Sequence, residues 1–397
     1  MNSIISNYVW PGQCYFGLGA AALAGEQAKA LGVTRVFVLA DPGVVKAGLL
    51  DALLPSLDAA TLSYTVYDQV VPNPDIESVD AAAVAMRASN ADCIIGIGGG
   101  SGLDTAKAVR LLMGSPATVG IADYSNLLGA DKLPLPNPRQ FPPMIAIPTT
   151  SGTGSEATPW GVITDLRVHR KFGFGGPTLM PTVALCDPEL TFGLPAFLTA
   201  ATAMDALTHL IEAYVSTNNH QPALDSLILQ GIALISQSLR VAVAQGKNAQ
   251  ARCNVMQAAL LGGMAISSNW LGACHSLAHP LSSIANVQHG VANAIMLPHQ
   301  MSFSLPGALE RYAKIAATLD PAYDTNEPVR LRAEYAVEAV ESLLEDVGLP
   351  LTLREAGVQE AQLDPLAAQA ILDLNWTTNP RSVTQADLRQ LYQQAFE

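Results

Sequence analysis

The first half of the chain alternates short apolar runs with stretches whose apolar residues recur at helical spacing. Runs of this kind, bounded by Gly, Pro, Asn or Asp, are typical of buried strands, and helices between them favour a parallel sheet covered on both faces. The clearest helical stretches are residues 76–88 and 102–113. We expect strands at residues 34–40, 63–68, 93–97, 144–147, 162–164 and 183–186.

The pattern changes near residue 195. Long Ala- and Leu-rich segments with helical periodicity continue from there to the C-terminus, without the alternation typical of strands. Pro188 and Pro195 punctuate the chain where the change occurs. The sequence therefore predicts an α/β domain over residues 1–190, followed by an all-helical domain over residues 191–397.

Composition narrows the class of protein. A chain of 397 residues is long enough for two domains, and 49% hydrophobic with only 14% charged residues excludes a disordered chain. The net charge of −13 argues against nucleic acid as a partner. The sequence has neither an apolar run of about 18 residues nor a basic secretory leader, so we expect a cytoplasmic protein with no membrane partner. The five scattered cysteines are expected to be reduced thiols.

The histidines are strongly clustered, because six of the seven lie in the second half of the chain. Asp205 precedes His209 by four residues, which places both side chains on one face of a helix. The same spacing separates His275 from His279, and His289 follows ten residues later. Three imidazoles and a carboxylate that converge from separate helices make a typical site for a divalent transition metal.

Other chemistry for these residues is less favoured. An unpaired buried carboxylate is costly, and a bound cation would compensate the charge of Asp205. The zinc-protease motif His-Glu-x-x-His does not occur in the sequence. Glu212 is expected to support a ligand rather than to bind the metal. Cys274 is a minor alternative ligand, and His299 is expected to be structural.

A glycine-rich loop follows the third expected strand and opens a helix. Gly98, Gly99 and Gly100 would let phosphate oxygens approach the backbone, where the helix N-terminus supplies free N–H groups. Ser101 stands where the Rossmann fingerprint requires a further glycine, and Ser101 with Asp104 also forms an ordinary capping box. The loop alone is therefore weak support for a bound nucleotide.

A second loop, residues 148–156, follows the fourth expected strand. It holds five hydroxyl side chains and two glycines, which suit phosphate and ribose oxygens. Thr149, Thr150 and Ser155 are the candidate contacts, and the alternative is an ordinary polar loop. Binding is the favoured interpretation.

Asp41 comes just after the first expected strand. A carboxylate in this position accepts both ribose hydroxyls of adenosine and repels a 2′-phosphate, which favours NAD over NADP. The sequence Asp41-Pro42-Gly43 is equally typical of a surface turn.

Taken together, these segments resemble the iron-containing (group III) alcohol dehydrogenases, and the likeness covers nearly the whole chain. The most specific segments are residues 199–216 and 272–299, because they reproduce the identity and the spacing of the family's metal ligands. The resemblance implies a dehydroquinate-synthase-like fold, with an N-terminal dinucleotide-binding domain, an all-helical domain and a cleft between them. It also implies a homodimer or larger oligomer, paired near residues 7–16.

The resemblance assigns roles by position. It implies NAD(H)-linked interconversion of a small primary alcohol or diol and its aldehyde. His279 matches a histidine beside the nicotinamide and is our candidate for the proton path. Asn73, Asp104, Lys171 and Leu185 match positions on the cofactor side. Fe²⁺, which Zn²⁺ could replace, would be bound by Asp205, His209, His275 and His289.

The chain also departs from the family pattern. Trp160 and Trp270 place large rings where smaller residues are usual, so the substrate does not carry over from any member. The main alternative is a non-redox lyase resembling dehydroquinate synthase, which would share the fold, NAD and metal. Such an enzyme needs several basic residues for its anionic substrate, and few lie near these motifs.

Overall fold

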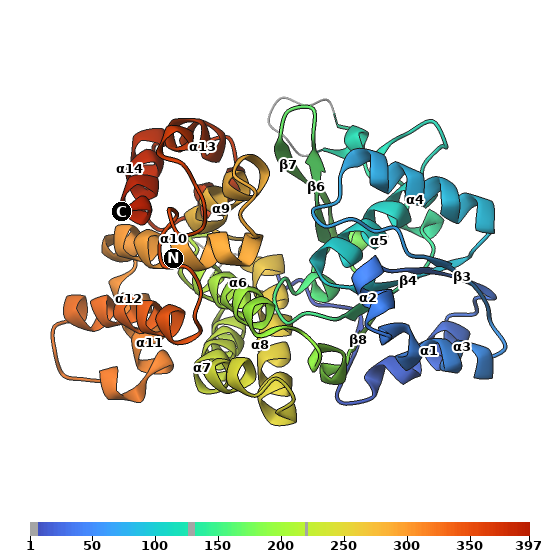
Figure 1. The fold of residues 1–397 in the computed structure, drawn as a ribbon, viewed down its shortest axis with the longest axis horizontal. Helices are drawn as coiled ribbons and strands as arrows, with labels where there is room; N and C mark the ends of the chain where they lie inside the picture. The colour runs from blue at the N-terminus through green and yellow to red at the C-terminus, as the bar shows by residue number, and fades with distance from the viewer. Residues whose placement is uncertain (1–6, 126–131, 219–220) are drawn as a thin grey trace. The chain divides into compact units, whose positions relative to one another are not determined.

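The computed structural model describes residues 7–125, 132–218 and 221–397. The chain forms two compact units, which Figure 1 shows as ribbons. The α/β unit comprises residues 10–150 and 154–193. Of the described residues, the helical unit comprises those within 194–397, the short segment 151–153 and residues 7–9.

The α/β unit is built on one six-stranded sheet, in which every neighbouring pair of strands is parallel. The strand order is β1-β8-β5-β4-β2-β3. The strands are β1 (Gln13–Phe16), β2 (Arg35–Leu39), β3 (Ser63–Tyr67), β4 (Cys93–Gly98), β5 (Met144–Pro148) and β8 (Val183–Cys186).

Helices cover both faces of this sheet because its central strands are apolar on both sides. Phe37 and Leu39 of β2 belong to the buried cluster that includes apolar residues of α4 (Ile76–Ser89) and α5 (Gly100–Met113). Val36 and Val38 belong to the opposite cluster, with apolar residues of α1 (Ala24–Ala30) and α3 (Leu54–Ala59). The parallel sheet expected from the continuous apolar runs is therefore confirmed.

One expected strand lies outside this sheet. Residues 162–164 belong to β6 (Trp160–Asp165), which pairs antiparallel with β7 (Arg170–Gly175) in a separate two-stranded sheet. Only four residues join the two strands, and His169 takes a positive φ of 47° in the turn. A link this short can form a hairpin but cannot make the crossover that a parallel pair requires.

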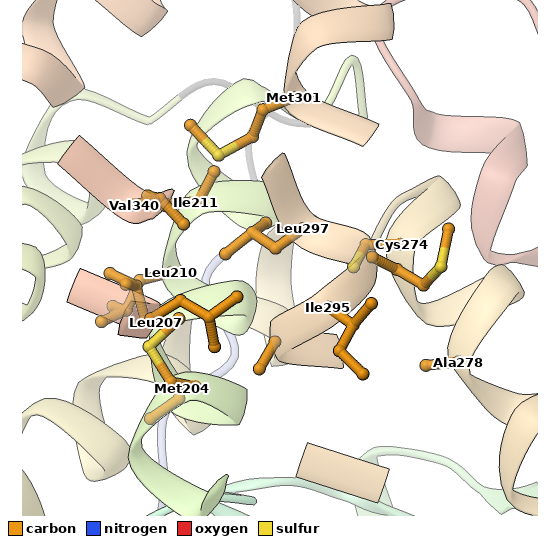
Figure 2. Close-up of a cluster of buried hydrophobic side chains, with 14 of the residues drawn as sticks. Met204, Leu207, Leu210, Ile211, Cys274, Ala278, Ile295, Leu297, Met301 and Val340 are labelled. Atoms are coloured by element: carbon orange, nitrogen blue, oxygen red, sulfur yellow. The ribbon is translucent and has the colours of Figure 1, made fainter. Parts of the chain in front are cut away.

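The helical unit confirms the all-helical second half. Apolar residues of its helices form one continuous buried cluster, part of which Figure 2 shows between α6, α9, α10 and α12. The helices are α6 (Ala196–Val215), α7 (Pro222–Ala244), α8 (Ala249–Asn269), α9 (Ala273–Ile284), α10 (His289–Ser304), α11 (Leu309–Leu319), α12 (Val329–Asp346), α13 (Leu363–Ala370) and α14 (Gln385–Phe396).

Helix α6 lies at the centre of this unit, since every residue from Ala203 to Val215 is buried. Small residues on its neighbours allow close approach. A Cβ added at Gly262 of α8 would lie 3.3 Å from the His209 Cβ. One added at Gly290 of α10 would lie only 2.1 Å from the Ala201 carbonyl oxygen. The N-terminus of α10 is therefore pressed directly against α6.

Helix α7 is, by length and composition, the one described helix that could cross a membrane. Its residues Leu224, Ile228 and Ile232 are buried in the cluster of the helical unit. Near its C-terminus, the Arg240 guanidinium pairs with the Asp346 carboxylate of α12 at 2.6 Å. These contacts show that α7 packs one face against the helical unit.

Candidate metal centre

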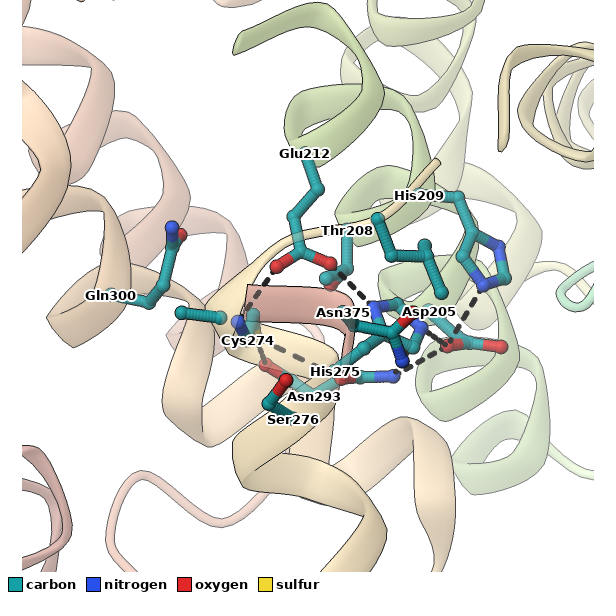
Figure 3. A network of polar contacts seen from close by, with 12 residues as sticks. Asp205, Thr208, His209, Glu212, Cys274, His275, Ser276, Asn293, Gln300 and Asn375 are labelled. Carbon is teal, nitrogen blue, oxygen red and sulfur yellow. Dashed lines mark hydrogen bonds and ion pairs between the residues drawn. The ribbon is translucent and has the colours of Figure 1, made fainter. Parts of the chain in front are cut away.

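The clustered histidines meet inside the helical unit. Helix α6 carries Asp205 and His209 at the expected spacing, α9 carries His275, and α10 begins at His289. Helix α10 packs against both α6 and α9, which brings the three helices together at this point. Figure 3 shows Asp205, His209 and His275 turned toward one another in a network of polar contacts.

The distances fit a single cation. One oxygen of Asp205, Oδ1, lies 3.6 Å from Nε2 of His275 and 3.6 Å from Nε2 of His289. Nε2 of His209 lies 3.8 Å from the same oxygen. Ligand atoms of a tetrahedral site with bonds near 2.1 Å are separated by about 3.4 Å. The ligand atoms of Asp205, His275 and His289 lie within 4.8 Å of one another, which is close enough for one divalent ion. His209 is close to the Asp205 oxygen but is not part of that group, so binding of one ion by all four side chains remains a prediction.

The charge states of these groups also suit a cation. Burial opposes ionisation of Asp205, but His209, His289 and His275 together hold its pKa below the ordinary value. Burial lowers the pKa of His209 to about 4, so its imidazole is neutral at pH 7. Burial also disfavours charge on His275, yet the Glu212 and Asp205 carboxylates outweigh it and raise its pKa to about 9. A cation therefore has to displace a proton from His275 when it binds.

Glu212 orients His275. Its Oε2 lies 2.5 Å from Nδ1 of His275, and its Oε1 accepts a hydrogen bond from the Cys274 backbone N–H at 2.7 Å. A Cβ at Gly272 would come within 2.7 Å of the same Oε1, so only glycine fits there. With Nδ1 facing a carboxylate, His275 presents Nε2 toward Asp205 as the ligand atom. The geometry matches the supporting role expected for Glu212.

Asn293 is part of the site but is not identifiable from the histidine pattern. Its Nδ2 donates to Asp205 Oδ1 at 2.6 Å and lies 3.2 Å from Nε2 of His275 and 3.3 Å from Nε2 of His289. The one feature of the sequence that could have indicated Asn293 is its position four residues after His289, on the same face of α10. The Asn293 amide therefore holds the Asp205 carboxylate in place among the imidazoles.

Cys274 is not among the residues whose ligand atoms gather at the candidate metal site. Its thiol donates to the Asn293 backbone carbonyl at 3.5 Å. Burial raises the pKa of this thiol well above its ordinary value, so the sulfur stays protonated. The minor alternative in which Cys274 binds the metal is not supported.

His279 lies beside this cluster without joining it. Its ring centroid is 5.4 Å from that of His289 and 6.0 Å from that of His275. Its Nδ1 is 2.6 Å from Oδ2 of Asp373, a residue 94 positions later in the chain. The histidine expected to transfer a proton is thus held next to the candidate metal ligands by the carboxylate of Asp373, which its local sequence does not indicate.

The α/β unit gathers several of the expected cofactor residues at the carboxyl ends of its strands. Gly98 ends β4, and a Cβ there would lie 3.5 Å from the Asp41 carboxylate. A Cβ at Gly99 would lie 3.1 Å from the Thr150 side chain. The Asn73 backbone N–H donates to the Ser101 hydroxyl at 3.2 Å. This edge of a parallel sheet is where open α/β folds bind dinucleotides.

Some of these side chains already have partners within the protein. Oδ1 of Asp41 caps the short helix α2 (Pro42–Lys46) by accepting from the Gly43 and Val44 N–H groups. The Asp104 carboxylate accepts from the Ser155 hydroxyl at 2.7 Å and from the Val162 N–H at 2.9 Å.

The remaining expected contacts lie on strands, directly after a strand, or at the start of a helix. Gly100 begins helix α5, Thr149 is buried directly after β5, Lys171 lies on β7, and Leu185 is fully buried in β8. Contact of these residues with a cofactor remains a prediction.

Comparison with known protein families gives matches in both halves of the chain. Residues 11–188 match the family described as iron-containing alcohol dehydrogenase. Residues 199–396 match the C-terminal part of the Fe-containing alcohol dehydrogenase family. The two matches thus cover both the α/β half and the helical half.

Individual relatives align over nearly their full length. The 1,3-propanediol dehydrogenase of Citrobacter freundii is 36% identical over 98% of each chain. The lactaldehyde reductase of Escherichia coli strain K12 is 37% identical over 96% of this chain and 97% of that enzyme. A solved alcohol dehydrogenase from Oenococcus oeni is similar with a TM-score of 0.92 and 36% identity, over 99% of this chain and 100% of that chain. The chain belongs to the iron-containing alcohol dehydrogenase family and is an NAD-linked oxidoreductase that interconverts alcohols and aldehydes.

Proposed function

We propose that this protein acts on short alcohols or diols and their aldehydes, with Fe²⁺ bound by Asp205, His209, His275 and His289. The observation that carries the proposal is the convergence of three imidazole nitrogens on Oδ1 of one buried carboxylate. A set of nitrogen and oxygen donors without thiolate suits Fe²⁺, although Zn²⁺ competes for such a set. The non-redox lyase alternative is not favoured, since the similar enzymes named above are oxidoreductases.

Side chains of the protein have separate proposed roles in ligand positioning and proton transfer. Bound iron would supply a Lewis acid for the substrate oxygen, and bound NAD(H) would supply the hydride chemistry. Glu212 and Asn293 hold His275 and Asp205 in their binding orientations. We propose that His279 takes up the hydroxyl proton during alcohol oxidation and returns it during aldehyde reduction.

Short substrates are favoured by two observations. The similar enzymes include ones named for 1,3-propanediol and for lactaldehyde, which are three-carbon compounds. Trp270 lies five residues before His275, remains 42% exposed and holds φ at 66°, a conformation costly for an aromatic residue. We propose that this ring narrows the approach to the metal centre.

We also propose a homodimer or larger oligomer in the cytoplasm. Strand β1 is an edge strand of the sheet and pairs with β8 on one side. Phe16 is 36% exposed and Leu18 is 50% exposed at the end of this strand. An open edge with exposed apolar residues favours pairing with a second copy of the chain.

The metal dependence is tested by removal and return of iron. Protein stripped by a chelator should not oxidise NADH with 3-hydroxypropanal or lactaldehyde, and anaerobic Fe²⁺ should restore the rate. Decanal, as a long comparator, should be reduced more slowly than the three-carbon aldehydes. NADH absorbance in the near ultraviolet measures each rate, and equal rates in stripped and reloaded samples would exclude the metal mechanism.

Removal of one ligand should separate metal binding from cofactor binding. In His275→Ala we expect loss of bound iron and a fall in kcat of at least about a thousandfold, since a Lewis acid contributes several kcal/mol. NADH should still bind, as measured by its fluorescence. His299→Ala, which removes a histidine of α10 outside the cluster, is the matched control. Wild-type turnover in His275→Ala would contradict the ligand assignment.

Glu212→Gln should weaken the metal site without removing a ligand. The amide oxygen would keep the Cys274 N–H bond, so the NH₂ group would face Nδ1 of His275 and drive the proton onto Nε2. We expect iron affinity, measured by chelator competition, to fall by about 10- to 100-fold. Glu334→Gln, an exposed change on α12, should leave it unaltered. An unchanged affinity in Glu212→Gln would show that Glu212 does not set the tautomer.

The cofactor preference is tested at Asp41. Loss of its negative charge in Asp41→Gly should raise the ratio of kcat/KM for NADPH to that for NADH by about tenfold or more, which corresponds to about 1.4 kcal/mol. Asp41→Asn keeps a capping side chain on α2 but removes the charge, so it should shift the ratio in the same direction. If both variants keep the wild-type ratio, Asp41 does not contact the ribose.

A further inference from the structure

His279 pairs with the carboxylate of Asp373, much as His275 pairs with that of Glu212. Asp373 directly precedes the short helix η11 (Leu374–Thr378) and forms its N-cap. Its side chain is 19% exposed, and that of His279 is 15% exposed. The pair is therefore partly shielded from water, which strengthens the hydrogen bond between the two groups.

A backbone donor fixes the direction of one hydrogen bond to the Asp373 carboxylate. The Trp376 N–H donates to the Ser276 hydroxyl oxygen at 2.9 Å, so the hydroxyl proton is available to donate to Oδ1 of Asp373 at 3.2 Å. The Asn375 N–H donates to the same Oδ1 at 2.9 Å. Oδ1 thus accepts from the Asn375 backbone N–H, a donor that cannot reverse, and Oδ2 is the oxygen that faces His279.

These bonds determine which nitrogen of His279 carries the proton. An ionised carboxylate can only accept, so Nδ1 of His279, at 2.6 Å from Oδ2, must donate. Burial opposes the charge of Asp373, but His279 and the surrounding donors lower the pKa of its carboxyl group, which keeps it ionised. Nε2 of the neutral ring is then left without a proton and can accept one.

We propose that Asp373 is a positioning residue that holds His279 in the Nδ1-protonated tautomer, with Nε2 free to accept the substrate's proton. This inference rests on the proton role proposed above for His279. The ring beside the metal ligands takes the proton at Nε2, and Asp373 stabilises the imidazolium that forms through the bond at Nδ1. In the reverse direction the same proton returns from Nε2 to the product oxygen.

The change Asp373→Asn reverses this tautomer with little change in shape. The Asn375 N–H and the Ser276 hydroxyl still point at the Oδ1 position, so the amide oxygen must stay there. The NH₂ group then faces Nδ1 of His279, which has to accept, and the ring proton moves to Nε2. A general base with its accepting nitrogen already protonated cannot take up the substrate's proton.

The test compares Asp373→Asn with His279→Ala and with the double variant, all loaded with iron. We expect Asp373→Asn to lower kcat by about 10²- to 10⁴-fold, the usual contribution of a general base. Aldehyde KM, the dissociation constant of NADH and iron content should stay within about threefold of wild type. The double variant should be no slower than His279→Ala, because both changes disable one proton step.

Control variants separate positioning from folding. Asp373→Glu restores an acceptor and should recover part of kcat, whereas Asp364→Asn, an exposed carboxylate of α13, should have no effect. Nitrogen NMR of metal-free protein with ¹⁵N-labelled histidine, assigned by comparison with His279→Ala, should show the ring proton on Nδ1 in wild type and on Nε2 in Asp373→Asn.

The outcomes distinguish this inference from the proposed function. Wild-type kcat in Asp373→Asn with an inactive His279→Ala would overturn the role of Asp373 and leave the function intact. A loss of iron in Asp373→Asn would also overturn it, because Asp373 would then support the metal site itself. Wild-type kcat in His279→Ala would instead remove the proton role in the proposed function.

Discussion

Burial of the Asp205 carboxylate is the constraint on which the helical unit depends. A lone carboxylate inside a protein costs several kcal/mol, and replacement of its water shell requires donors from several directions. Here the Asn293 amide of α10 donates a hydrogen bond to the carboxylate. The imidazoles of His209, His275 and His289, from α6, α9 and α10, surround the same oxygen at 3.6 to 3.8 Å. Helix α10 can lie this close to α6 because it has glycine at position 290, and Gly262 allows α8 the same close approach. The packing that stabilises one buried charge therefore also builds a site for a cation.

Helix α9 gives its two histidines different tasks through their outer partners. His275 and His279 lie one turn apart on one face, and each places Nδ1 against a carboxylate. Glu212 comes from α6, and Asp373 comes from the connection before η11, so tertiary structure supplies both. Nε2 of His275, the ring close to Asp205, belongs to the candidate metal site, whereas His279 lies outside the proposed ligand set. The two histidines of α9 are thus distinguished by their positions relative to Asp205 and by the carboxylate that each one contacts through Nδ1.

The local sequence pattern was sufficient to predict those features that depend on residues close together in the chain. Apolar runs predicted β2, β4 and β5, and the four-residue spacing placed Asp205 with His209 on one face. The sequence did not reveal that residues 162–164 pair with β7 in a hairpin. Strand β7 begins with the polar residues Arg170 and Lys171, so it lacks the apolar run used to predict the other strands. The sequence did not identify Asp373 either, since the contact with His279 spans 94 positions. Contacts of this kind depend on how whole helices pack, which periodicity does not encode.

Asp104 and Asp41 differ in how many of their carboxylate oxygens already accept hydrogen bonds within the protein, and this difference bears on their roles. Both oxygens of Asp104 accept hydrogen bonds within the α/β unit, from Ser155 and Val162, so a cofactor contact there would require one of them to break. Asp41 caps α2 through Oδ1 alone, and its Oδ2 lies on the side of Gly98. The turn and ribose interpretations of Asp41 are therefore compatible, because they use different oxygens. By the same reasoning Asp104 is better explained as the residue that ties α5 to the segment after β5, and Asp41 is the stronger candidate to contact the nucleotide.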